Sequence, residues 1–101
     1  MIHVIASIQI KEGRREAFVE IFKANVPLVK KEKGCMEYFP AIDVPTGLAP
    51  QELNDTVVTV IEKWHSLKEL HAHLEAPHML AYREKVKDMV ENVSLKILEE
   101  V

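Results

Sequence analysis

The first ten residues constrain the fold more than any other stretch, because apolar residues recur at every second position from Ile2 to Ile10. A period of two is typical of a β-strand that lies against a core. The other face of this segment is also partly apolar, since it includes Ile5. We therefore expect residues 1–11 to form a strand that is covered on both faces, followed by a turn that ends at Gly13.

The periodicity changes several times after this strand. Apolar residues at three- and four-residue steps predict a helix from Arg14 to about Lys33, with a kink at Pro27. Pro40 cannot donate to a strand ladder, so its strand belongs at an edge or a bulge. The other predicted elements are strands over 35–43, 56–64 and 93–101, a surface loop over 44–55, and two short helices that begin near Ser66 and at Pro77, the second ending near Val90.

The order strand, helix, strand, strand, helix pair, strand predicts an α+β fold of the ferredoxin-like kind, with the helices on one face of the sheet. All 101 residues fit one domain. The sheet face away from the helices carries apolar side chains that need a cover. The simplest cover is a second copy of the chain, so we expect a homodimer.

Composition narrows the classes of partner. The net charge is −3 and the 13 basic residues are scattered, so we do not expect nucleic acid as a partner. No apolar run approaches the roughly 18 residues of a membrane span, and the first residues lack the basic start of a signal peptide. The single cysteine, Cys35, cannot form an internal disulfide. We expect a cytoplasmic protein.

The groups that can carry protons gather between Glu62 and Tyr82. This stretch holds four of the five histidines, the only tryptophan and one of the two tyrosines. His78 and Tyr82 are four residues apart on a helix and share a face, and His73 can point the same way across a break near Ala76. With Glu62 and Trp64 nearby, these side chains predict a pocket that contains an acid/base group.

Plainer interpretations stay open for the same residues. His78 could cap the first turn of its helix, while Tyr82 and Trp64 could be ordinary core residues. A metal site built on His71, His73 and His78 is disfavoured, because residues two apart on a helix point to different sides. We therefore expect no metal.

The chain resembles the antibiotic biosynthesis monooxygenase family, and within it the small bacterial quinol monooxygenases. The resemblance covers nearly the whole chain and rests on VIASIQIKEGRREAF, VPLVKKEKGCMEY, IEKWHSLKELHAHLEAPHMLAYREKV and NVSLKILEE. It implies a dimeric ferredoxin-like α+β barrel that acts on polycyclic phenols or hydroquinones with O2 and without flavin, haem or metal. The site residues that it implies are Trp64, His73, His78 and Tyr82, with Glu62 at the edge and Tyr38 and Met79 as further substrate contacts.

Two departures limit what the resemblance implies. The haem-degrading relatives carry an asparagine in the first strand and a histidine late in the last helix, and this chain has neither. Another class of relatives consists of sugar-phosphate isomerases. This chain has no phosphate-binding cluster that would favour that activity.

The first hypothesis is therefore a cofactor-independent oxygenase or oxidase. His78 by preference, or His73, takes a proton from a quinol hydroxyl, and Trp64 and Tyr82 stack on the ring. It predicts that His73, His78 and Tyr82 line one closed cavity. The alternatives are a non-catalytic, stress-associated dimer that binds a small aromatic or carbonyl compound, and an isomerase of a small hydroxyketone.

Overall fold

The computed structural model describes residues 1–101 and contains four strands and three helices in the predicted order. In chain order they are β1 (Ile2–Ile10), α1 (Arg15–Lys30), β2 (Cys35–Ala41), β3 (Val57–Trp64), α2 (Leu67–Glu75), α3 (Pro77–Val86) and β4 (Val90–Leu98). None of the helices has the length and apolar character that a membrane span requires.

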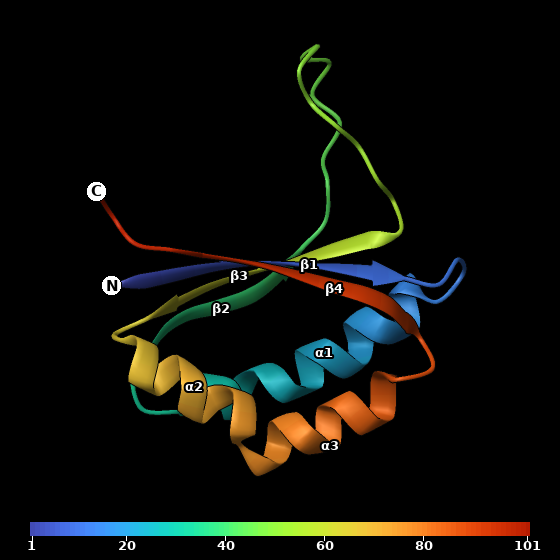
Figure 1. Ribbon diagram of the computed structural model, residues 1–101. Coiled ribbons are helices and arrows are strands. Elements are labelled where there is room, and N and C mark those ends of the chain that lie inside the picture. The colour runs from blue at the N-terminus through green and yellow to red at the C-terminus, as the bar shows by residue number, and fades with distance from the viewer.

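The four strands form one antiparallel sheet in the order β2-β3-β1-β4, and all three helices lie on one face of it (Figure 1). This arrangement confirms the predicted ferredoxin-like α+β fold. It also places β2 at an edge, as the missing donor of Pro40 required. Residues 42–56 contain no helix or strand and project from the sheet on the side away from the helices (Figure 1).

The core lies between the sheet and the helices. Every second residue of β1, from Ile2 to Ile10, is buried, and the residues between them are half-buried. Val58, Val60, Glu62 and Trp64 of β3 follow the same alternation, so the carboxylate ends up on the buried face as its position in the sequence indicated. The face of the sheet away from the helices has no cover within the single chain (Figure 1).

Two helices end earlier than predicted. α3 ends at Val86 instead of Val90, because Met89 turns back to donate to the Val86 carbonyl and then accepts from the Lys11 amide, which starts β4 at Val90. α1 ends at Lys30, and the turn that follows holds Glu32, whose amide donates to the Val29 carbonyl. Both helices end at backbone hydrogen bonds of the following turn or of a distant strand. A helical pattern of apolar residues cannot predict such bonds.

Candidate active site

An apolar cavity of about 470 Å³, open to solvent, lies between the helix-facing side of the sheet and helices α2 and α3. Twelve of its sixteen lining residues are hydrophobic, and the other four are Glu62, His73, Arg83 and Lys87. Its floor comes from β1, β3 and β4. Because α2 and α3 leave the β4 edge uncovered, Val93 and Leu95 form one wall while staying about half exposed.

His73 is the most buried polar residue of this cavity, with 1% of its surface exposed. Its Nδ1 lies 2.9 Å from Glu32 Oε2, and its Nε2 lies 4.0 Å from Glu62 Oε1. The imidazole also packs against the rings of Trp64 and Tyr38, with centroid distances of 4.6 and 5.4 Å. Burial lowers the pKa of His73 and outweighs the contact with Glu32, which would raise it. The ring is therefore a neutral base near pH 7.

Glu62 is the second proton carrier at the cavity, and 7% of its surface is exposed. The Trp64 indole N–H donates to its Oε1 at 2.9 Å. Burial raises the pKa of Glu62 from 4.5 to about 7; the Trp64 hydrogen bond opposes this rise and the charge of Glu32 adds to it. A carboxyl group with this pKa exchanges protons near neutral pH.

Glu32 joins two of the histidines and was not predicted as a site residue. The same oxygen that contacts His73, Oε2, lies 2.8 Å from His78 Nε2. The sequence places Glu32 among Lys30, Lys31 and Lys33 at the end of α1, where it looks like one more surface charge. Only the packing of α2 and α3 against this turn could identify it.

His78 does not line the cavity, which corrects the prediction that His73, His78 and Tyr82 share one closed space. Its side chain is 23% exposed and faces a separate hollow between α1 and α3. Tyr82 borders both hollows, so the shared helix face was predicted correctly. One part of that face, at Tyr82, borders the cavity, and the part at His78 borders only the outer hollow. His73 is therefore the histidine that lines the cavity.

The predicted substrate-contact residues differ in whether they line the cavity. Tyr38, Met79 and Tyr82 line the cavity as predicted, whereas Trp64 is fully buried and does not. The expected stacking of Trp64 on a substrate is therefore wrong for this structure; the indole acts on Glu62 and His73 instead. Burial is the main cause that raises the pKa of both tyrosines, so their phenols stay protonated near pH 7.

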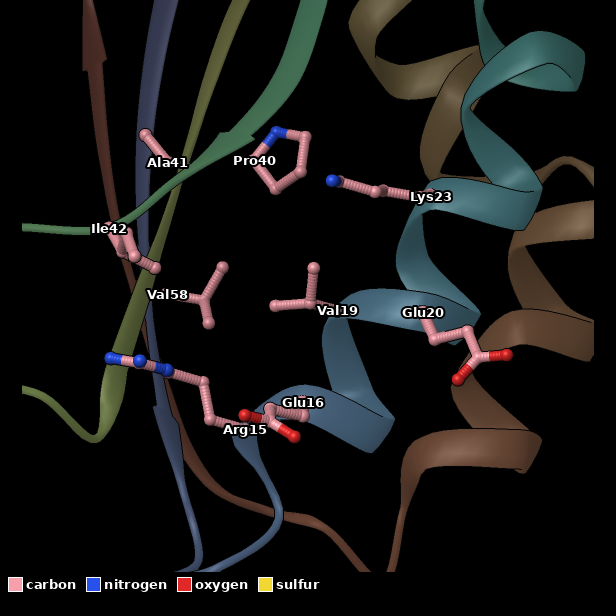
Figure 2. A pocket seen from close by; sticks show the side chains of 9 residues that line it. All are labelled: Arg15, Glu16, Val19, Glu20, Lys23, Pro40, Ala41, Ile42 and Val58. Carbon is pink, nitrogen blue, oxygen red and sulfur yellow. The ribbon is translucent and has the colours of Figure 1, made fainter.

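A second hollow, of about 480 Å³, lies between α1 and the strands β2 and β3. Figure 2 shows the side chains that line it. Val19 and Val58 face each other across it, and the Lys23 side chain extends toward Pro40. Its lining contains no histidine, cysteine or tyrosine. Its charged residues Glu16, Glu20 and Lys23 are exposed, whereas His73 and Glu62 of the first cavity are buried, so we place the candidate site at the first cavity.

No group of three or more His, Cys, Asp or Glu side chains is arranged so that it could hold a metal ion. His73 and His78 meet at Glu32, while His71 is exposed on α2.

Comparison with known proteins gives the family. The antibiotic biosynthesis monooxygenase family model matches residues 1–85. The chain is 40% identical over 101 residues to the Escherichia coli K12 protein named "Probable quinol monooxygenase YgiN", covering 98% of this chain and 97% of that one, and equally to the protein of the same name from Shigella flexneri.

Solved structures show the same fold at lower identity. PA3566 from Pseudomonas aeruginosa superposes with a TM-score of 0.82 at 23% identity, covering 99% of this chain and 93% of that one. A conserved protein from Methanosarcina mazei Go1 superposes with a TM-score of 0.84 at 20% identity, covering 99% and 92%. The family match and the close relatives together show an enzyme of the monooxygenase class, and the chain belongs to the antibiotic biosynthesis monooxygenase family.

Proposed function

We propose that this protein is a cofactor-independent oxygenase that takes a quinol or a polycyclic phenol as substrate and O2 as co-substrate. The observation that carries the proposal is a neutral, buried imidazole and a carboxyl group of near-neutral pKa in one apolar cavity. A flat aromatic ring suits the lining of Phe22, Tyr38 and Tyr82, whose rings already pack against one another. The name of the 40% identical relative supports a quinol.

The reaction begins with proton transfer. His73 Nε2 accepts the proton of a quinol hydroxyl, and Glu62 beside it is a second acceptor when it is ionised. The resulting anion is electron-rich and gives one electron to O2, which forms a semiquinone and superoxide. Their recombination at a ring carbon and loss of water give a hydroxylated quinone, so one oxygen atom enters the product and the other leaves as water. The apolar walls keep bulk water from quenching the radical pair.

Oxygen uptake with a reduced naphthoquinone, corrected for autoxidation, tests the proposal. His73→Ala should lower kcat by a factor on the order of 10² to 10⁴, the usual contribution of a general base. His71→Ala is the matched control, because His71 is exposed on the same helix. Wild-type uptake no faster than autoxidation, or a folded His73→Ala protein with wild-type kcat, would overturn the proposal.

Four further readouts separate the alternatives. Saturable quenching of Trp64 fluorescence by quinones without turnover would indicate a binding protein. Exchange of substrate protons without O2, followed by NMR, would indicate an isomerase. Oxygen-18 in the product indicates hydroxylation, whereas hydrogen peroxide equal to the O2 consumed indicates simple oxidation.

We also propose that two copies pair through the sheet face away from the helices. The register aligns Phe39 with Ile61 and Ile61 with Ile5, which makes an apolar row across β2, β3 and β1. The segment 42–56 projects on the same side of the sheet (Figure 1). It carries four large exposed apolar side chains, which are Ile42, Val44, Leu48 and Leu53. Light scattering should give twice the chain mass, and Phe39→Asp should give a monomer. A wild-type monomer at micromolar concentration would contradict this pairing.

A further inference from the structure

We propose that Glu32 is a positioning residue that fixes His73 in the tautomer with Nε2 free to accept a proton, and that His78 orients Glu32 through a second hydrogen bond to the same oxygen. This inference rests on the proposed oxygenase function and adds two residues that lie outside the cavity.

The hydrogen-bond pattern determines the tautomer. An ionised carboxylate oxygen only accepts hydrogen bonds, so both ring nitrogens that meet Glu32 Oε2 must carry hydrogen. These nitrogens are Nδ1 of His73, at 2.9 Å, and Nε2 of His78, at 2.8 Å. A neutral imidazole has one hydrogen, so Nε2 of His73 is left with a free lone pair. This is the nitrogen on the Glu62 side, where the cavity lies.

The role of His78 follows from the same oxygen. Two N–H donors meet at one carboxylate oxygen, and charge-assisted hydrogen bonds of 2.8–2.9 Å are strong ones, so they hold the carboxylate in place. Glu32 is mostly buried, with 13% of its side chain exposed, so it depends on these donors more than a surface carboxylate would. The histidine that faces the outer hollow thus supports the one at the cavity.

The charge on Glu32 matters most after proton transfer. When His73 becomes an imidazolium, Glu32 lies against Nδ1 and stabilises the new charge, as a buried aspartate does in a serine protease triad. The other titratable or charged groups around His73 are Tyr38 from β2, Glu62 from β3, and His78 and Arg83 from α3. The charges of Arg83 and His78 disfavour a protonated His73 ring. The carboxylates of Glu32 and Glu62 must therefore stabilise the imidazolium.

Nitrogen-15 NMR of the histidine rings tests the inference without reference to activity. In the wild-type protein the neutral His73 ring should show a protonated Nδ1 and an unprotonated Nε2. In Glu32→Gln the side-chain amide can donate to Nδ1, so the ring should change to the tautomer with Nε2 protonated. His78→Ala should keep the wild-type tautomer. Finding Nε2 of His73 protonated in the wild-type protein would overturn the proposal, even if no variant folds.

Kinetics add a readout that a purely structural role would not move. Glu32→Gln should lower kcat for the quinol by a factor on the order of 10² to 10⁴ with KM nearly unchanged, because the cavity lining is intact. The loss should shrink at alkaline pH, where the quinol hydroxyl ionises without a base. Glu32→Asp keeps a carboxylate and should recover part of kcat, and Glu75→Gln, an exposed site on α2, is the matched control.

The outcomes separate the two proposals. If the wild-type protein shows no quinol oxidation but His73 has the expected tautomer, the oxygenase function fails and the positioning role of Glu32 stands. If oxidation is present but Glu32→Gln keeps the wild-type kcat and tautomer, the oxygenase function stands and the role of Glu32 is overturned.

Discussion

The indole N–H of Trp64 donates to Glu62 Oε1 at 2.9 Å, and the two residues are neighbours on the buried face of β3. The pair is local, because alternate residues of a strand point to the same side. A fully buried tryptophan needs a partner for its N–H, and a buried carboxylate needs a donor. The hydrogen bond between them satisfies both groups and fixes the carboxyl group at the cavity.

Trp64→Phe should destabilise the protein more at pH 8 than at pH 5. The substitution removes volume at both pH values, but only at pH 8 does it leave an ionised, buried carboxylate without its donor. The extra loss at pH 8 should be about 1–3 kcal/mol in the free energy of unfolding. Urea unfolding followed by circular dichroism measures it, since the only tryptophan is gone. Equal losses at both pH values would show that the hydrogen bond contributes nothing beyond packing.

Stability should fall as the pH rises through the range in which Glu62 ionises. Its pKa is raised to about 7 in the folded protein from 4.5, so the folded state binds more protons than the unfolded state between these values. The contribution is therefore fully present below about pH 4.5 and lost above about pH 7, with a size of up to about 3 kcal/mol. The lowered pKa of His73 acts in the opposite sense, because it favours the folded state as pH rises.

Glu62→Gln separates the contribution of Glu62 to the pH dependence of stability from that of His73. The difference in free energy of unfolding between variant and wild type should move in favour of the variant by up to about 3 kcal/mol from pH 4.5 to pH 8. Urea unfolding at several pH values measures this difference. The exposed Glu75→Gln should show no such trend. A pH-independent difference for Glu62→Gln would mean that the carboxyl group keeps an ordinary pKa.

The fold and much of the cavity could be predicted because they depend on short periods in the sequence. The alternation over Val57–Trp64 put Glu62 on the buried side, and the four-residue step put His78 and Tyr82 on one helix face. Both are properties of a single element. The interpretation of Tyr82 as a cavity residue was correct for this reason.

The parts that failed depend on contacts between elements. Glu32 lies 41 residues from His73 in sequence, and nothing in the charged end of α1 distinguishes it from its neighbours. The face that His78 and Tyr82 share is divided by the packing of α3 on α1, which no helical period encodes. Trp64 is likewise fully buried in contact with α2, whose His73 ring packs against the indole.

Val93→Trp should block the cavity without unfolding the protein. Val93 forms part of the β4 wall and is 52% exposed, so a larger ring can extend into the cavity while the core keeps its packing. We expect the KM for a quinol to rise about tenfold or more, which corresponds to about 1.4 kcal/mol of lost binding. Leu80→Trp is the control, because Leu80 is exposed on α3 and does not line the cavity. An unchanged KM for Val93→Trp would place the substrate elsewhere.

Gly34→Ala should destabilise the protein more than Gly47→Ala, although both glycines have positive φ angles, 81° and 78°. A Cβ at Gly34 would come within 2.5 Å of Glu69 Cγ, whereas one at Gly47 would meet nothing within 4 Å. Gly34 cannot move away easily, because its carbonyl accepts the His65 amide at 2.8 Å. Gly47→Ala should cost about 1 kcal/mol for the backbone alone, and Gly34→Ala at least about 1 kcal/mol more.

Urea unfolding of the two glycine variants measures this difference directly. Because Gly34 follows Glu32 by two residues, a shift of this turn should also move the carboxylate away from His73 and lower kcat in the Gly34 variant alone. Equal stabilities for the two variants would show that the turn relaxes around a methyl group. In that case the contact between α2 and the end of α1 would be too loose to hold Glu32 against the two imidazoles.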